Sequence, residues 1–146
     1  YLDAQALAAN ALLAAERPEQ ALERLAAIER LAPDFTQLHY RKGLALARLG
    51  SWETAAAAFD RQRALDPLFA ANLERLAVAA KELGDFPRTR QAALAALSLD
   101  PKDPVRWLAL SDIYARERRL GQARRLKQEA AKLRRKQKSS RPPREG

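Results

Sequence analysis

Three prolines recur at an interval of 34 residues, and this spacing limits the possible folds of the chain more than any other feature. Pro33, Pro67 and Pro101 each stand two positions after a leucine, and Gly50 and Gly84 keep the same interval. A fixed period of this length is typical of repeat proteins, in which each small structural unit packs only against its neighbours. The spacing predicts four units, over residues 2–35, 36–69, 70–103 and 104–137.

The hydrophobic residues indicate which secondary structure fills these units. Ala and Leu, the strongest apolar helix formers, supply 56 of the 69 hydrophobic residues. The β-branched residues Val, Ile and Thr, which favour strands, total only seven. This composition predicts an all-α protein with two helices in each unit, over residues 2–15, 18–32, 36–49, 52–65, 69–83, 86–99, 104–117 and 120–136.

The repeat resembles the tetratricopeptide repeat, a helical hairpin of 34 residues with aromatic, small and proline residues at fixed positions. The matching residues of the second and fourth units are Gly43, Gly50, Trp52, Ala55, Phe59 and Pro67, and Trp107, Leu110, Ser111, Tyr114 and Ala123. The likeness extends from residue 2 to about residue 136. It implies a right-handed superhelical solenoid of antiparallel helix pairs, in which Trp107 and Tyr114 are mostly buried.

Other positions of the pattern have mechanical roles. Small residues allow the two helices of a hairpin to approach closely, and they are Ala9, Gly43, Ala77 and Ser111. Gly50 and Gly84 accept the left-handed backbone that ends the first helix, and Arg118 takes this place in the fourth unit. We expect Ser51 and Asp85 to cap the second helices of their hairpins.

The third unit departs from the pattern. Thr89 stands where a small alanine is usual, and Ala93 stands where an aromatic residue is usual. These two departures predict a loosely packed third hairpin. His39 occupies the first aromatic position of the second unit, where a structural role is favoured over catalysis.

In this family the first helix of each hairpin lines a concave face. The resemblance therefore implies a peptide-binding groove formed by Asn10, Tyr40, Arg41, Leu44, Arg48, Glu74, Arg75, Val78 and Asp112. Arg41 and Arg48 share one helix face, and Arg75 follows Arg41 by one repeat. Because arginine binds carboxylates bidentately, we expect a peptide with an acidic residue or a free carboxylate beside an apolar anchor. Alternatively, the arginines pair with the groove's own acids and leave no charge for a ligand.

Some members of the family clamp the C-terminal carboxylate of chaperones with a set of Lys, Asn, Asn, Lys and Arg residues. Asn10 and Arg75 match two members of that set, but Ala6, Arg41 and Ala71 occupy the other places. The sequence therefore does not support this clamp.

The formal net charge of +9 belongs to the C-terminal end. Residues 1–115 hold 14 Lys and Arg against 15 Asp and Glu, whereas residues 116–146 hold 13 against 3. The helix expected over residues 120–136 has one apolar stripe between mainly basic faces. The stripe consists of Leu120, Ala123, Leu126, Ala130 and Leu133. This pattern favours a polar cap on the last helix of the array.

The alternative for this end is an adaptor that binds nucleic acid or an anionic membrane. No aromatic residues interleave the basic ones, so a platform for stacking bases is absent from the sequence of this segment. We expect weak, non-specific polyanion binding at most. Residues 137–146 are expected to form a basic, disordered tail.

The sequence lacks a Gly-rich phosphate loop, EF-hand or zinc spacing, and any cysteine. We therefore expect no enzyme activity, no metal and no cofactor. The expected partner is a protein or peptide, with a preference for acidic ones, rather than a small-molecule substrate. A second alternative is the docking domain of a larger enzyme or assembly factor, since the absence of Met indicates a segment of a longer protein.

No apolar run approaches the roughly 20 residues needed to cross a bilayer. We expect a soluble protein of the cytoplasm or periplasm. The richness in Ala, Arg and Leu favours a bacterial source with a GC-rich genome.

Overall fold

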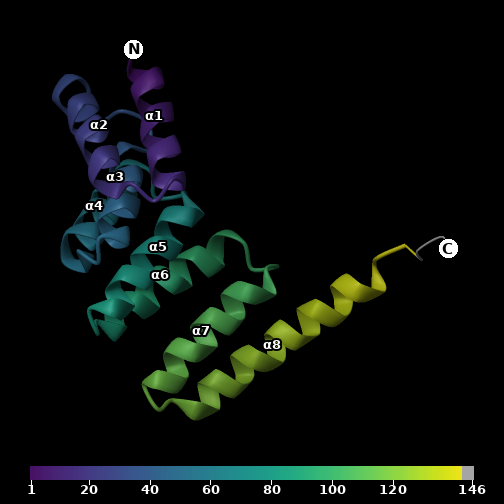
Figure 1. The fold of residues 1–146 in the computed structure, drawn as a ribbon. Helices are drawn as coiled ribbons and strands as arrows, with labels where there is room; N and C mark the ends of the chain where they lie inside the picture. Colours follow the sequence, from purple (N-terminus) through teal and green to yellow (C-terminus); the bar gives the residue numbers. More distant parts are fainter. Residues whose placement is uncertain (143–146) are drawn as a thin grey trace.

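The computed structural model describes residues 1–142, which form eight helices and no strand (Figure 1). They are α1 (Leu2–Ala14), α2 (Pro18–Leu31), α3 (Leu38–Arg48), α4 (Trp52–Leu65), α5 (Ala70–Glu82), α6 (Phe86–Leu99), α7 (Pro104–Arg116) and α8 (Leu120–Ser139). None of the helices within this range is both long and apolar enough to cross a membrane. The predicted all-α architecture is confirmed.

The helices pair as four antiparallel hairpins that stack in sequence order (Figure 1). Each helix packs against the next one along the chain, and among the first helices α1 also contacts α3 and α3 contacts α5. Within residues 1–142 the backbones of the second helices of successive hairpins do not come as close, although the side chains of Arg88 in α6 and Asp60 in α4 form an ion pair. The array therefore curves toward its first helices, which form the concave side.

The third and fourth hairpins meet differently from the others. The second helix of the third hairpin, α6, packs on α7, but within the described part of the chain the backbones of α5 and α7 do not come close, and a side-chain ion pair of Arg106 with Glu74 spans the space between them. Figure 1 shows α7 and α8 turned away from the first three hairpins, which stack closely. The concave side is therefore open between the third and fourth hairpins.

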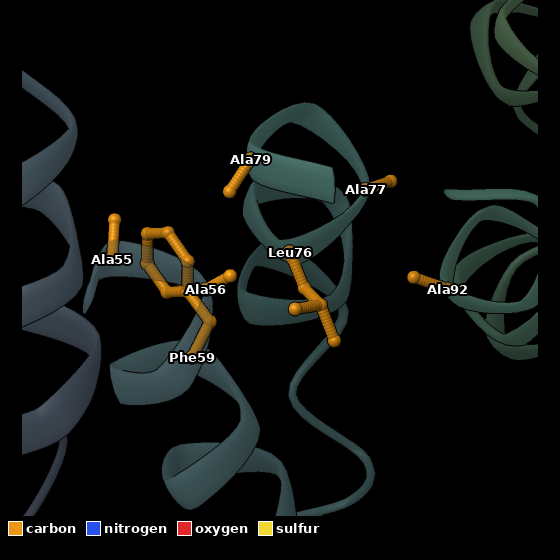
Figure 2. Close-up of a cluster of buried hydrophobic side chains, with 7 residues drawn as sticks. All are labelled: Ala55, Ala56, Phe59, Leu76, Ala77, Ala79 and Ala92. Atoms are coloured by element: carbon orange, nitrogen blue, oxygen red, sulfur yellow. The ribbon is translucent and has the colours of Figure 1, made fainter. Parts of the chain in front are cut away.

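The centre of the core lies between the second and third hairpins. Phe59 of α4 is 1% exposed and packs in one cluster with Leu76 and Ala79 of α5. Figure 2 shows the Phe59 side chain directed toward these residues. On its other side the ring lies against Gly43 of α3, where even a methyl group would not fit. The predicted close approach of α3 and α4 at Gly43 is confirmed.

The turn inside every hairpin has one residue with a left-handed backbone. These residues are 34 positions apart, and they are Glu16 (φ 56°), Gly50 (φ 73°), Gly84 (φ 74°) and Arg118 (φ 57°). The prediction for the two glycines is confirmed. Arg118 adopts the same conformation although its Cβ makes that conformation unfavourable.

Helix starts differ in part from the prediction. The predicted helix over 36–49 begins at Leu38, because Gln37 has a left-handed backbone with φ of 57°. Ser51 precedes α4 but its side chain makes no capping bond, so that prediction is wrong. The carboxylate of Asp85 accepts a hydrogen bond from the amide of Arg88, as predicted, and Asp103 caps α7 in a similar way.

The last helix is longer than predicted. The expected boundary at residue 136 is wrong, because α8 continues through Ser139; Gln137 within this extension donates a hydrogen bond to the carbonyl of Lys102 at 3.1 Å. The end of the predicted tail, 143–146, lies outside the described residues. The apolar stripe packs inward at Ala123 and Ala130, whereas Leu120 is 57% exposed.

The two aromatic residues of α7 are mostly buried, as predicted, although neither is fully enclosed. Trp107 and Tyr114 lie at the edge of a cluster formed by Leu97, Leu110 and Ile113. The indole of Trp107 donates a hydrogen bond to the carbonyl of Pro101 at 2.7 Å. Because no further hairpin covers α7 and α8 within the described residues, one side of each ring remains open to solvent.

Candidate peptide-binding groove

The structure brings together only some of the nine residues that the sequence implicated in a groove. They lie on α1, α3, α5 and α7, the first helices of the four hairpins. Two groups form. One joins Asn10 to Arg41 across the first two hairpins, and the other places Glu74, Val78 and Asp112 around an opening between the last two.

Arg41 is held in place by neutral acceptors. Its Nε donates to Asn10 Oδ1 at 3.0 Å, and its Nη1 donates to the carbonyl oxygen of Thr36 at 2.6 Å. Burial lowers the pKa of Arg41, because desolvation disfavours the charged guanidinium. No carboxylate pairs with it within residues 1–142. The structure therefore holds a partly desolvated positive charge on the concave side without a counter-ion.

Arg48 and Arg75 extend this positive character. Both side chains are exposed, and neither has an ion-pair partner in the part of the chain that the structure describes. The alternative in which the three arginines pair with the groove's own acids is therefore not what the structure shows. No acidic side chain within residues 1–142 neutralises any of the three.

Tyr40 and Leu44 take part in packing between hairpins. Both are half-buried against the core clusters, and the Tyr40 ring meets Phe69 edge-on, with centroids 4.7 Å apart. Their apolar surface is largely used by the protein itself. The open apolar surface of the concave side lies further along the array.

A cleft of about 820 Å³ opens between α5, α6 and α7. Pockets of roughly 300–1,000 Å³ are typical of ligand sites. Its floor and mouth are formed mainly by alanines and aliphatic residues, with charged side chains around them. The lining residues are Glu74, Ala77, Val78, Lys81, Thr89, Ala93, Ala96, Asp103, Val105, Arg106, Ala109, Asp112, Ile113, Ala115 and Arg116.

The cleft exists because α6 presents small side chains to it. Ala93 stands one repeat after Phe59, the ring that fills the corresponding space between the second and third hairpins. Thr89 is buried and its hydroxyl donates to the carbonyl of Asp85 at 2.8 Å, so it too adds little volume. The predicted loose packing within the third hairpin is wrong, because Thr89 is buried and α5 packs closely on α6; the open space lies between the third and fourth hairpins.

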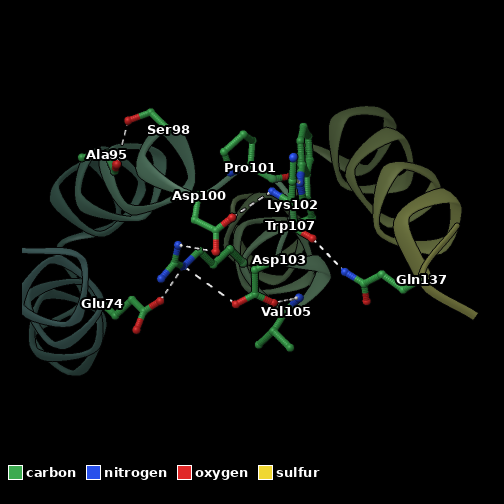
Figure 3. Close-up of polar contacts among 11 residues, drawn as sticks. Glu74, Ala95, Ser98, Asp100, Pro101, Lys102, Asp103, Val105, Trp107 and Gln137 are labelled. Atoms are coloured by element: carbon green, nitrogen blue, oxygen red, sulfur yellow. Dashed lines mark hydrogen bonds and ion pairs between the residues drawn. The ribbon is translucent and has the colours of Figure 1, made fainter. Parts of the chain in front are cut away.

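Arg106 is the residue of this region that the sequence reasoning missed. Its Nε donates to Glu74 at 2.7 Å, and carboxylate oxygens of Asp100 and Asp103 lie 3.5 and 3.9 Å from the guanidinium. The hydrogen bond that Arg106 donates to Glu74 raises the pKa of Arg106, and the charges of both aspartates raise it further. Figure 3 shows Glu74 approaching from α5 while Asp100 and Asp103 approach from the loop before α7. This cluster links the third and fourth hairpins at one end of the cleft.

A second polar cluster joins the same two hairpins near the turn between α7 and α8. Arg90 of α6 pairs with Glu117, and the guanidinium groups of Arg90 and Arg119 lie 5.9 and 5.2 Å from the centroid of the Tyr114 ring. Glu117 also approaches Arg119 at 3.9 Å. The charged groups of this cluster are thus paired with one another, and none of its residues lines the cleft.

The remaining candidates have structural roles. His39 is 2% exposed, and its Nε2 lies 2.8 Å from the carbonyl oxygen of Pro33, within hydrogen-bond distance. Ser111 is buried and donates to the carbonyl of Ala123 at 2.8 Å, which joins α7 to α8. Within residues 1–142 no group of three or more His, Cys, Asp or Glu side chains is placed to hold a metal ion.

The comparisons with known proteins agree with this geometry. A family model of the tetratricopeptide repeat matches residues 7–72. Two crystal structures of MamA superpose with TM-scores of 0.90 and 0.91 at 16% sequence identity, over 95% and 100% of this chain and 81% and 80% of theirs. MamA 41-end from Desulfovibrio magneticus RS-1 superposes with a TM-score of 0.87 at 20% identity, over 94% of this chain and 77% of that one. At such identities the likeness concerns the fold. Among curated proteins, none matches.

Proposed function

We propose that this chain, whose residues 7–72 match a family model of the tetratricopeptide repeat, is a non-catalytic scaffold that holds a peptide segment of a partner protein along its concave side. Solenoids present an extended surface built from successive first helices, and such a surface suits an extended ligand. The segment it prefers carries acidic residues or a free carboxylate.

The observation that carries this proposal is the environment of Arg41. The guanidinium is partly desolvated, oriented by Asn10 and by a backbone carbonyl, and has no carboxylate partner within the described residues. Orienting a guanidinium in advance reduces the entropy lost when it binds a ligand carboxylate. Arg48 and Arg75 add exposed positive charge on the same side, which favours an anionic segment.

A peptide-array screen tests the proposal. The parent protein is expected to select acidic peptides. Arg41→Ala and Arg75→Ala are each expected to lower the affinity for the selected peptides about tenfold. A loss of this size corresponds to one charge-assisted hydrogen bond. Arg30→Ala is the matched control, because Arg30 is an exposed arginine on α2, a second helix. Selected peptides without acidic bias, or equal binding by both groove variants, would refute the proposal.

A second candidate function rests on α8. Seven of its Arg and Lys residues, together with Arg141 beyond the helix end as an eighth, are exposed without an ion-pair partner within residues 1–142, whereas Lys132 pairs with Glu129 at 2.8 Å. The eight are Arg124, Arg125, Lys127, Arg134, Arg135, Lys136, Lys138 and Arg141, the last of which follows the helix end. Such a surface attracts polyanions through phosphate neutralisation.

A salt titration separates this adaptor function from simple capping. If α8 acts mainly as a polar cap, binding to duplex DNA or to vesicles containing phosphatidylserine is expected to be weak and to fall steeply with salt. Submicromolar, sequence-selective binding to DNA at about 150 mM salt would instead favour the adaptor.

A further inference from the structure

One repeat position is filled by a large side chain in the first two hairpins and is left empty in the third. Leu25 and Phe59 occupy it in the first and second hairpins and are 0% and 1% exposed. In the third hairpin the equivalent residue is Ala93, which lines the cleft of about 820 Å³ between α5, α6 and α7. The space that a large side chain fills inside the other junctions is open to solvent here.

The interior of the cleft is apolar. Ala77, Ala93, Ala96, Ala109 and Ile113 contribute methyl and aliphatic groups to its surface. Val78 and Val105 stand at its mouth and are 38% and 61% exposed. A groove of this kind gains free energy when an apolar group displaces its water.

The charges around the cleft are distributed unevenly. Toward the beginnings of α5 and α7, Glu74 and Asp103 are occupied by Arg106. Toward the ends of the same helices, Lys81 and Arg116 lie in the last turns, and neither has an ion-pair partner among residues 1–142. Asp112, one turn before Arg116, is likewise outside the ion pairs of the described residues. The free charge at this end therefore comprises two cations and one anion.

We propose that the cleft receives one aromatic side chain of a bound peptide, at the place where the chain itself has Ala93 instead of an aromatic residue. An acidic residue next to that aromatic side chain lies toward Lys81 and Arg116. The inference rests on the proposed function, since it names the apolar anchor of the segment held along the concave side. Aromatic residues suit the cleft because each buries about 150–250 Å² with little loss of rotamer entropy.

The test uses the full chain and labelled, N-acetylated decapeptides with a Gly-Ser background. One peptide contains Phe-Asp-Glu, a second replaces the Phe with Ala, and a third replaces Asp-Glu with Asn-Gln. Fluorescence anisotropy is expected to show at least tenfold tighter binding for the first peptide than for the second. The third is expected to bind several-fold more weakly than the first. Equal affinities for the first two peptides overturn the inference.

Ala93→Phe fills the cleft from within. This variant is expected to have a higher melting temperature than the parent protein and to bind the Phe-Asp-Glu peptide at least tenfold more weakly. Leu94→Phe is the matched control, because Leu94 is 42% exposed on the same helix and does not line the cleft. It is expected to bind like the parent. A folded Ala93→Phe protein that binds the peptide as well as the parent overturns the inference.

A second variant decides the matter even if Ala93→Phe does not fold. Replacing both Lys81 and Arg116 with Ala changes only the rim, and it is expected to abolish the advantage of the first peptide over the third while preserving the preference for Phe. Loss of acidic preference in Arg41→Ala, with no effect of any cleft variant, would leave the proposed function intact and refute the anchor site. Failure of all array and Phe-containing peptides to bind refutes both.

Discussion

The Cα of Gly43 faces the ring of Phe59 so closely that a Cβ at position 43 would lie 2.4 Å from Cε1 of the ring. This distance is far below van der Waals contact. Gly43 is buried in α3, and Phe59 is the largest side chain at the centre of the core. The Phe59 ring therefore occupies the space that a side chain at position 43 would need, so the two residues depend on each other.

Gly43→Ala is expected to destabilise the protein by about 1–3 kcal/mol, although alanine favours helices more than glycine. The reason is that overpacking a filled core costs more than the gain in helix propensity. Urea unfolding followed by circular dichroism measures the change. Combining it with Phe59→Leu, which shortens the opposing side chain, is expected to cost less than the sum of the two single changes.

Gly121→Ala is the matched control for this experiment. Gly121 is also helical, but no atom lies within 4 Å of a Cβ added there. This variant is expected to stabilise the protein by up to about 1 kcal/mol. If both glycine variants gain stability, the contact between α3 and Phe59 is looser than the structure shows.

Arg118→Gly is expected to stabilise the fourth hairpin by about 1 kcal/mol. Arg118 has a φ of 57° at the turn position that Gly84 occupies with a φ of 74°, and a left-handed backbone costs a residue with a side chain roughly 1–2 kcal/mol. Gly84→Ala is the reciprocal change and is expected to destabilise by a similar amount. Thermal unfolding measures the stability of both variants. A stability change of the same sign in the two variants would contradict the prediction.

Arg106→Met is expected to loosen the attachment of the fourth hairpin. It removes the cation that Glu74, Asp100 and Asp103 share, at a cost of about 1 kcal/mol because the carboxylates are partly exposed and screened. Hydrogen exchange is expected to accelerate in α7 and α8 and to remain unchanged in α1 and α2. Lys132→Met, which breaks a single exposed pair within α8, serves as the control and should change neither.

The ion pair between Glu29 and Lys42 makes stability depend on pH in the acidic range. The hydrogen bond from Lys42, 2.6 Å long, holds the pKa of Glu29 below its ordinary value of 4.5, despite some desolvation. A carboxyl group with a depressed folded-state pKa contributes stability above the unfolded-state pKa, and this contribution is lost as the pH falls through the folded value.

As the pH falls from about 5 to about 3, the Lys42→Met variant is therefore expected to lose less stability than the parent. This is roughly the range that spans the unfolded-state and folded-state pKa values of Glu29. The difference is expected to be less than about 1 kcal/mol, since both side chains are partly exposed. Urea titrations at several pH values provide the measurement. A parallel pH profile for parent and variant would show that the pair contributes nothing to folding.

The sequence predicted most of the repeat architecture, because its signals are local. The turn at Gly84, the cap at Asp85 and the close approach at Gly43 each depend on residues within one hairpin. The errors occurred where local signals were weak. Gln37 is an ordinary residue in a left-handed conformation. The part of α8 beyond residue 136 contains Gln137, which donates a hydrogen bond to the carbonyl of Lys102, 35 residues away.

The candidate groove was predictable only in part. The repeat period identified Arg41, Arg75 and their neighbours as residues of the first helices, but it did not show that Asn10 would orient Arg41. Arg106 escaped notice because its three carboxylate partners come from α5 and from the loop before α7. No spacing within one repeat unit marks such a cluster.

The sequence alone determined the number, order and pairing of the helices. Proline, glycine and alanine at one fixed interval restrict the backbone within each hairpin, and these restrictions act between neighbouring residues. The tertiary structure alone decided that Tyr40 packs inside the array and that the empty place at Ala93 becomes an open cleft. A small residue at such a position leaves a space, and a neighbouring helix can move in to close it. Whether that happens depends on how whole hairpins pack. Here the backbones of α5 and α7 stay apart and only the side chains of Arg106 and Glu74 meet between them, so the rest of the space remains accessible.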